Sequence, residues 1–291
     1  MSTPDNPFSG RTLYASPDSS AAVAASAAEG TDEAAAFTDL AETPTAIWLL
    51  PEVHPTASIT DFVYAVMADA VTRSQVPVFV VYGIPGRDCG NFSAGGLDAE
   101  EYPHWVSAIA AGLGSYEAIL VVEPDALALS PSCDSEEGTT ALVAEAVSRL
   151  SLATGATIYL DGGHSHWLPP EQMAPLLLAA GVERVRGFST NVSNFNTTED
   201  ERAYAEALSE LLDGAHYVID TSRNGNGSNG EWCNPSGRAI GDTPTGVDDG
   251  SAQDASLWIK NPGESDGECN GGPAAGHWYP AQAIELSRGG R

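Results

Sequence analysis

Hydrophobic residues along the chain gather in short, β-branched runs, and five of these runs stop at polar residues set among glycines. Continuous runs such as 119–122 are typical of strands buried on both faces of a parallel sheet. Two further apolar runs bring the number of predicted strands to seven. The predicted strands cover residues 46–50, 78–82, 119–123, 157–160, 186–191, 217–219 and 257–260.

Stretches with apolar residues at helical spacing alternate with these strands. The predicted helices cover residues 18–29, 32–41, 59–74, 99–113, 136–153, 170–180, 198–213 and 280–288, with an N-cap signature at Thr198. Strands that alternate with helices imply a parallel sheet with right-handed crossovers. We therefore predict a single α/β domain over 1–291, closed as a barrel, with its core at about 45–288.

Acidic residues follow most of the predicted strands, and a barrel of this kind places its active site at those strand ends. Forty acidic residues face twelve basic ones, for a formal net charge of −28. This charge argues against a nucleic acid or an anionic membrane as a partner, because phosphate binding needs clustered cations. The acidic surface is either an ordinary solvated one or an adaptation to high salt, and we favour salt tolerance.

No apolar window reaches the length of a membrane span. The start of the chain lacks a basic region followed by an apolar stretch, so a signal peptide has either been removed or was never present.

The four cysteines, Cys89, Cys133, Cys233 and Cys269, contain no CxxC pair, which argues against a zinc cluster. Two disulfides in a secreted protein are favoured over reduced thiols. Spacing alone leaves three possible pairings.

Two short motifs resemble cofactor or nucleophile sites without fitting them. The glycines of 225–230 follow a strand, but no apolar helix begins there to hold a dinucleotide. Ser165 lacks the closing glycine of a nucleophile elbow. His164 and His166 share one face of an extended segment but have no identifiable third metal ligand. We expect no cofactor and no metal.

The motifs with candidate chemistry lie at residues 81–90, 122–125, 159–164, 191–194, 220–227, 232–238, 257–267 and 276–280. Taken together, these motifs resemble glycoside hydrolase family 6, a family of cellulases. The resemblance implies a distorted seven-stranded barrel that hydrolyses β-1,4-glucan with inversion at the anomeric carbon. Inversion needs a protonated acid and a base with carboxyl groups about 6.5–9.5 Å apart. The match spans about residues 45–285 of the chain.

The resemblance assigns catalytic roles to four residues. Asp125 matches the general acid, and the apolar run before it could raise its pKa and keep it protonated. Asp88 matches a nearby carboxylate that raises the pKa of Asp125 further; its alternative is a turn or capping residue. Asp266 matches the proposed base, with a water chain as the alternative. Tyr82 matches the tyrosine beneath the scissile sugar, or is a core residue.

The resemblance also implies a set of sugar-binding residues. Tryptophan rings stack on the C–H faces of glucose while polar groups bind its hydroxyls. Lys260 is the only lysine in the chain, which suggests a site-specific role. The family's cysteine order implies Cys89–Cys133 and Cys233–Cys269 disulfides. The implied binding residues are Trp48, Asp161, His164, Trp167, Asn191, Asn194, Trp232, Lys260 and Glu264; Trp105 and Trp258 are expected in the core.

Loop length favours an endo-acting enzyme. Only residues 234–259 separate Cys233 from Lys260, which leaves no room for the two long lids of chain-end enzymes. We expect an open cleft and a secreted, monomeric endoglucanase. The alternatives are a cellobiohydrolase or mixed-linkage β-glucanase on the same scaffold, or a non-catalytic glucan-binding protein. A Ca²⁺-binding protein is disfavoured because the acids lack the D-x-D-x-D-G spacing.

Overall fold

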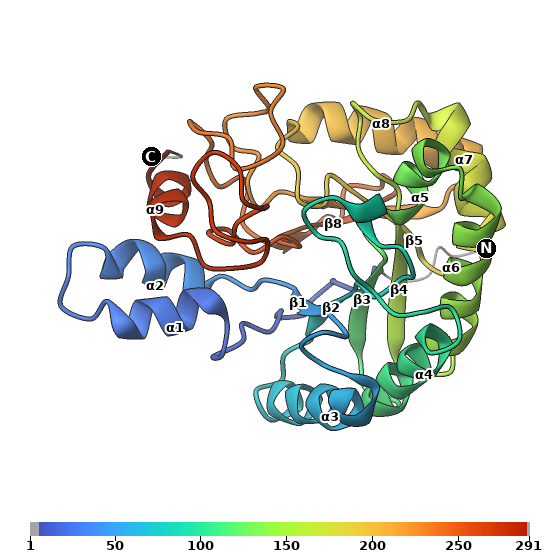
Figure 1. The fold of residues 1–291 in the computed structure, drawn as a ribbon, viewed down its shortest axis with the longest axis horizontal. Helices are drawn as coiled ribbons and strands as arrows, with labels where there is room; N and C mark the ends of the chain where they lie inside the picture. Colours follow the sequence, from blue (N-terminus) through green and yellow to red (C-terminus); the bar gives the residue numbers. More distant parts are fainter. Residues whose placement is uncertain (1–5, 290–291) are drawn as a thin grey trace.

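The computed structural model describes residues 6–289 and contains one curled, largely parallel sheet (Figure 1). Its strand order is β1-β2-β3-β4-β5-β6-β8-β7, and only the β7–β8 pair is antiparallel. The seven predicted parallel strands are present, and the short β7 is an eighth strand that the sequence analysis missed. The strands are β1 (Ile47–Leu49), β2 (Val78–Val81), β3 (Ala118–Val122), β4 (Ala156–Asp161), β5 (Gly187–Thr190), β6 (His216–Asp220), β7 (Thr245–Gly246) and β8 (Gln253–Leu257).

The barrel stays open between its first and last parallel strands. Within residues 6–289 no ladder pairs β1 with β8; the two edges are joined where Ala46 N donates to Trp258 O at 2.9 Å. The strand predicted at 257–260 lies earlier, at β8. The ladder stops at Leu257 because Ile259 N and Lys260 N donate to the carboxylate of Asp220 instead of to a neighbouring strand.

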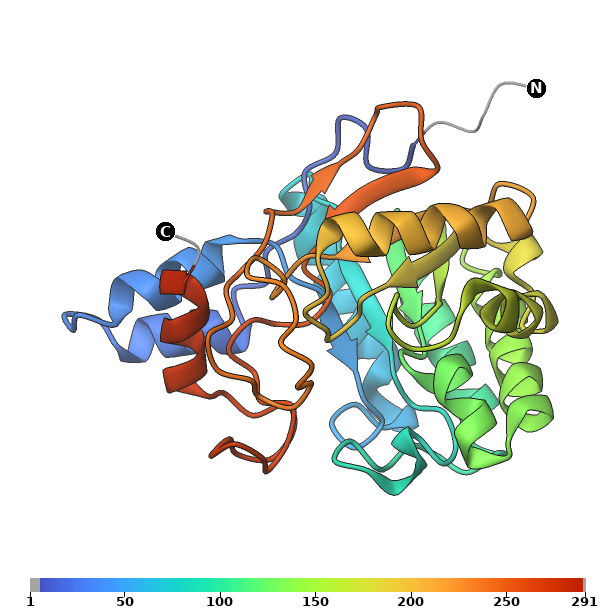
Figure 2. The same ribbon diagram turned by 90° about the horizontal axis from the view of Figure 1, so that it is seen from above.

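Helices cover the outer face of the sheet, and a smaller group lies beside its open edge (Figures 1 and 2). The covering helices are α3 (Thr56–Thr72), α4 (Tyr102–Leu113), α5 (Ala126–Leu129), α6 (Glu136–Leu150), α7 (Pro170–Ala179) and α8 (Thr198–Leu211). The edge group is α1 (Ser20–Ala27), α2 (Ala34–Glu42) and α9 (Pro280–Gly289). Three short 3₁₀ helices also lie within the described residues: Asp88–Gly90, Ser130–Cys133 and Val182–Arg184. No helix among residues 6–289 is long and apolar enough to cross a membrane.

Alternation along the strands separates two of the three core clusters, and the third packs α2 and α9 around Trp258. In β2, Phe79 and Val81 pack toward the helices, while Val78 and Val80 pack inside the curled sheet. Trp105 and Trp258 are buried, as predicted. The N-cap of α8 is Thr197 rather than Thr198, because the Thr197 hydroxyl accepts from Asp200 N at 3.1 Å.

The N-terminal segment is part of the fold, although the predicted core began at about residue 45. The Asn6 amide donates to Val247 O at 2.6 Å and to Asp254 O at 2.8 Å. Phe8 is 5% exposed and packs in the interior cluster, with its ring centroid 6.4 Å from that of Tyr159. The segment therefore closes the end of the barrel opposite the strands' carboxyl ends.

We predict that Phe8→Ala lowers the free energy of unfolding by about 3 kcal/mol, since it removes a buried aromatic ring and leaves a cavity. Urea denaturation followed by circular dichroism measures the change. Val23→Ala, at a side chain 61% exposed on α1, is the control and should change stability by less than about 0.5 kcal/mol. Equal stability of Phe8→Ala and the wild type would show that the segment does not contribute to the core.

Candidate active site

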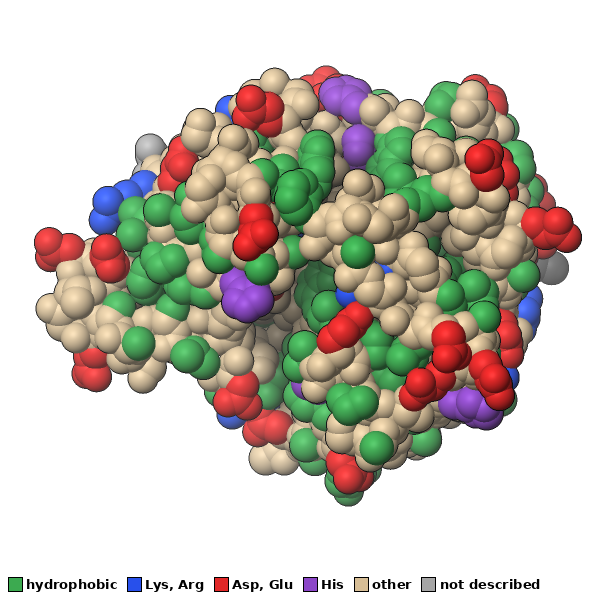
Figure 3. All heavy atoms as spheres, in the orientation of Figure 1, with side chains coloured by type: hydrophobic (Ala, Val, Ile, Leu, Met, Phe, Trp, Pro, Cys, Tyr) green, Lys and Arg blue, Asp and Glu red, His purple; other side chains and the backbone are tan. Residues whose placement is uncertain are grey.

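A cleft of about 1490 Å³ lies at the carboxyl ends of the parallel strands. Figure 3 shows it as a hollow near the middle of the face drawn. Every residue predicted to act in catalysis or sugar binding lines this cleft except Asp161 and Asn191. Residues that are distant in the sequence thus converge because parallel strands bring their ends to one edge.

The turn that carries Asp125 is held by a buried carboxylate. Glu123 and Asp125 have left-handed backbone angles, with φ of 50° and 69°, which are unfavourable for residues other than glycine. The Glu123 carboxylate is fully buried and accepts from Gly83 N at 3.0 Å, Ile84 N at 3.1 Å and the Tyr102 hydroxyl at 2.9 Å. Burial raises the pKa of Glu123 to about 7. Glu123 thus ties the Asp125 turn to the loop after β2.

Asp125 has the electrostatic surroundings of an acid that stays protonated near neutral pH. Burial raises its pKa to about 7, and the negative charges of Asp88 and Asp266 act in the same direction. Lys260 opposes them. The carboxyl group lines the cleft, where it can reach a bound molecule.

Asp161 lies behind the cleft wall and was wrongly expected to line it. It is 1% exposed; its Oδ2 accepts from Asp125 N at 3.0 Å and Gly163 N at 3.1 Å, and its Oδ1 from the Ser189 hydroxyl at 3.3 Å. Burial, followed by the charge of Asp125, raises the pKa of Asp161 well above its usual value. The side chain fixes the backbone of Asp125 and is not placed to bind a sugar.

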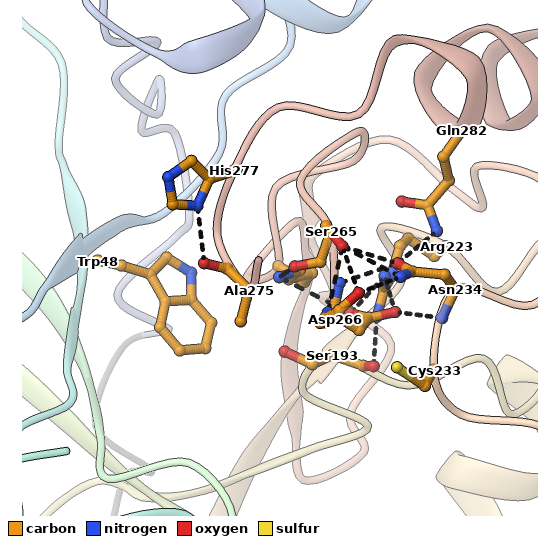
Figure 4. Close-up of polar contacts among 12 residues, drawn as sticks. Trp48, Ser193, Arg223, Cys233, Asn234, Ser265, Asp266, Ala275, His277 and Gln282 are labelled. Carbon is orange, nitrogen blue, oxygen red and sulfur yellow. Dashed lines mark hydrogen bonds and ion pairs between the residues drawn. The ribbon is translucent and has the colours of Figure 1, made fainter. Parts of the chain in front are cut away.

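Asp266 is held by a buried arginine (Figure 4). Arg223 is 0% exposed, and one of its nitrogens lies 2.9 Å from each oxygen of the Asp266 carboxylate. Asn234 N donates to Oδ2 at 3.0 Å, and the ammonium of Lys260 lies 3.8 Å from Oδ1. Much of the accepting capacity of Asp266 is therefore already used.

Lys260 is positioned through its backbone. Its N–H donates to Asp220 Oδ2 at 2.9 Å, while Ser193 N donates to the same oxygen at 3.1 Å. Burial lowers the pKa of Lys260 below its usual value, and the neighbouring charge of Asp266 opposes this shift only in part. Its ammonium donates to Ser265 O at 3.3 Å and lies 6.0 Å from the Trp48 ring centroid.

Tyr82, directly after β2, and Asp88, in the loop that follows, both line the cleft. The Arg87 guanidinium lies 4.7 Å from the Tyr82 ring centroid and donates to Tyr82 O at 2.8 Å. Asp88 has a φ of 60°, and its Oδ2 accepts from Ser93 N at 2.8 Å. Burial and the charges of Asp125 and Asp88 raise the pKa of Tyr82, so its hydroxyl stays neutral.

Aromatic rings are spread along the cleft. The Trp48 ring packs edge-on against the Tyr82 ring, with centroids 5.1 Å apart, and Trp48 Nε1 donates to Ile259 O at 2.8 Å. The ring centroids of Trp167 and His164 lie 5.3 Å apart. Trp232 is 52% exposed. Burial lowers the pKa of His164 to about 4, which leaves it a neutral hydrogen-bonding group near pH 7.

Asn191 is the second predicted binding residue that does not reach the cleft. It is 0% exposed, and its amide donates to Asn196 O at 3.1 Å and Asp220 O at 2.9 Å. Its Oδ1 accepts from Asn196 N at 3.2 Å, so the amide is satisfied internally. Asn194, three residues on, lines the cleft instead.

Two disulfides brace the loops beside the cleft. Cys89 pairs with Cys133 and Cys233 with Cys269, which confirms the pairing implied by the resemblance. No group of three His, Cys, Asp or Glu side chains within residues 6–289 is arranged to hold a metal ion.

Four residues that shape the site have no role predicted from the sequence: Glu123, Arg87, Asp220 and Arg223. Glu123 is the last residue of a predicted strand and Asp220 directly follows another, and that position was the available signal. Nothing local to Arg87 or Arg223 marks them, because their importance comes from burial among residues distant in sequence.

The model of Glycosyl hydrolases family 6 matches residues 8–289. Endoglucanase A of Cellulomonas fimi is 44% identical over 282 residues, which cover 96% of this chain and 61% of the relative. The chain therefore spans less than two thirds of that relative's length.

Two solved structures have the same fold. The endoglucanase Cel6 from Mycobacterium tuberculosis, in complex with methyl-cellobiosyl-4-deoxy-4-thio-β-D-cellobioside, has a TM-score of 0.93 and 45% identity, covering 98% of this chain and 99% of its own. The catalytic core domain of the cellobiohydrolase Cel6A from Chaetomium thermophilum has a TM-score of 0.84 and 28% identity, covering 98% of both chains.

We predict that Asp88→Asn lowers the pKa of Asp125. The charge of Asp88 favours the neutral form of Asp125, so its removal makes the proton easier to lose. Carboxyl ¹³C NMR titration of both proteins measures the shift, with an Asp125→Asn spectrum to assign the signal. Asp61→Asn, at an exposed position of α3 outside the cleft lining, is the control. An unchanged or higher pKa in Asp88→Asn contradicts the coupling.

Proposed function

Because the chain belongs to Glycosyl hydrolases family 6, we propose that it is an endo-β-1,4-glucanase that cleaves internal bonds of cellulose and related β-glucans. Asp125 carries the proposal: it lines the cleft beside Asp88, with a pKa raised to about 7. A carboxyl group that is still largely protonated in mildly acidic water is what a general acid of glycoside hydrolysis requires.

The proposed reaction is a single displacement with inversion. Asp125 gives its proton to the glycosidic oxygen as the bond from that oxygen to the anomeric carbon breaks. A water molecule attacks the same carbon from the opposite face and loses a proton to a base. The products are two shorter chains, one with a new α-anomeric end.

The base is Asp266 acting directly or through a chain of water molecules. Asp266 already accepts hydrogen bonds from Arg223 and Asn234, and Lys260 lies close to it. These contacts occupy much of the accepting capacity of the Asp266 carboxylate. We therefore favour the water chain, with Asp266 supplying negative charge near the developing positive charge on the sugar.

Substrate binding combines flat rings and polar groups. Trp48, Trp167 and Trp232 present aromatic surface to the C–H faces of glucose. Lys260 and Glu264 line the same cleft and can bind hydroxyl groups. Tyr82 keeps a neutral hydroxyl next to Asp125, where it can contact the sugar whose bond is cleaved.

The endo mode rests on the open cleft and on similarity. Only residues 234–259 separate Cys233 from Lys260, too few for the two long lids of chain-end enzymes. The two endoglucanases described above are also more similar to this chain than the cellobiohydrolase. A cellobiohydrolase or mixed-linkage β-glucanase is the alternative, and product profiles on cellohexaose and barley glucan separate them. A non-catalytic glucan-binding protein would have no need of a protonated acid.

Secretion is proposed from the cysteines. All four are paired in the two disulfides, which persist in oxidising environments outside the cytosol. We propose a monomer as the working state.

We predict that Asp125→Ala abolishes hydrolysis of cellohexaose, because the leaving oxygen then lacks a proton donor, while oligosaccharide binding stays nearly intact. Proton NMR of fresh products, together with calorimetric binding, checks both statements. Release of α-anomeric ends by the wild type alone supports an inverting glycosidase. Early β-anomers, or substantial turnover by Asp125→Ala, would contradict the mechanism.

We also predict that activity and thermal stability persist or rise in molar NaCl. At a net charge of −28 the folded chain repels itself, and about 1 M salt shortens the screening length to about 3 Å. Calorimetric melting and cellohexaose hydrolysis at low and at molar NaCl test the prediction. A steep loss of both activity and thermal stability above physiological salt would contradict salt adaptation.

A further inference from the structure

The cleft continues beyond Trp48 and Glu264 as a groove beside the open edge of the sheet. We call this part the distal groove; it runs between α3 and the segment that leads into α1. Figure 3 shows a hollow passing down from the middle of the face, between the lobe formed by α1 and α2 and the lobe that contains α3 (Figure 1). Its lining includes Ser20, Ile47, Phe62, Ala65, Val66 and Arg73.

A direct hydrogen bond joins the distal groove to the proposed sugar-binding residues. The Ser20 hydroxyl, in the first turn of α1, donates to Glu264 Oε1 at 2.6 Å. The Ser19 hydroxyl caps that helix by accepting from Ala22 N at 3.2 Å. Glu264 therefore contacts a side chain of the first turn of α1. The N-terminal segment thus helps to build the cleft wall.

The surface chemistry of the distal groove suits a sugar chain. Ile47, Phe62 and Val66 supply apolar surface, and the His54 ring stacks on Phe62 with centroids 3.8 Å apart. Polar side chains that can bind hydroxyl groups line the same groove, including the ion pair of Arg73 with Asp69 at 2.9 Å. A few polar groups around an apolar floor are typical of a small-molecule site.

The size and the charge of the cleft favour a long, neutral ligand. A volume of about 1490 Å³ exceeds the ~300–1,000 Å³ of pockets for single small ligands. The chain's charge of −28 disfavours a polyanion in any part of the cleft. A glucan already held at Lys260 and Glu264 could enter the distal groove without a separate encounter, which favours it over an independent ligand.

We propose that the distal groove is a further glucan subsite, which binds sugar units beyond the one held at Lys260 and Glu264. This inference rests on the proposed function. It gives residues 14–20 of the N-terminal segment a binding role as well as a structural one. Longer oligosaccharides should gain affinity from the groove, whereas cellobiose should not require it.

The test fills the groove from α3. Ala65 is exposed and lines the groove; Ala68 is exposed on the same helix and lies outside the lining. Ala65→Arg and Ala68→Arg add the same charge and use a residue that favours helices. Calorimetry in the Asp125→Ala background measures the dissociation constants of cellobiose and cellohexaose without hydrolysis.

We expect Ala65→Arg to weaken cellohexaose binding by about five- to tenfold, the loss of one or two hydrogen bonds, and to leave cellobiose binding unchanged. Ala68→Arg should match the parent for both sugars. Equal cellohexaose affinity in all three proteins overturns the inference, as does an equal loss in both arginine variants.

A second variant covers the case in which Ala65→Arg fails to fold, as judged by thermal melting. Asp18→Ala removes an exposed groove-lining carboxylate and should weaken cellohexaose binding by about two- to fivefold with no effect on cellobiose. Unchanged cellohexaose affinity then overturns the subsite. Failure of the proposed function is a separate result, in which the wild type cleaves no cello-oligosaccharide.

Discussion

Buried carboxylates accept backbone N–H groups just beyond the ends of the sheet, and the geometry of the cleft depends on these bonds. Asp220 accepts from Ile259 N and Lys260 N after β8, and from Ser193 N after β5. Glu123 and Asp161 do the same for the loops around Asp125. N–H groups past the last ladder bond would otherwise be buried without partners, at a cost of roughly 1–3 kcal/mol each.

The same arrangement sets the electrostatics of the site. Burial is the main cause that raises the pKa of Asp125 to about 7, and the negative charges of Asp88 and Asp266 act in the same direction. The chain has only twelve basic residues, and Arg87, Arg223 and Lys260 are buried around the cleft. The positive charges of these residues offset part of the repulsion among the acids. Asp125, unlike Glu123 and Asp161, lines the cleft, where its proton can reach a bound molecule.

The opening between β1 and β8 explains both the shape of the cleft and the role of the N-terminal segment. With a single backbone hydrogen bond joining Ala46 to Trp258, that edge cannot close as a ladder. The α1–α2 hairpin lies beside the edge, and Ser20 reaches Glu264 from it. A closed barrel would have left no room for a groove that continues past Trp48.

Local patterns in the sequence are enough to predict the parallel strands, most helices and the polar residues that follow each strand. β-Branched runs specify buried strands, and helical periodicity specifies which face packs. Asp125, Asp88 and Lys260 could therefore be assigned to one cleft from their places at the ends of predicted strands or in the loops that follow them. Folding in three dimensions sets the rest: Asp161 and Asn191 lie behind the wall, β8 ends at Leu257, and residues before 45 line the cleft. Those outcomes depend on sheet curvature and on hydrogen bonds between distant residues, which no local pattern encodes.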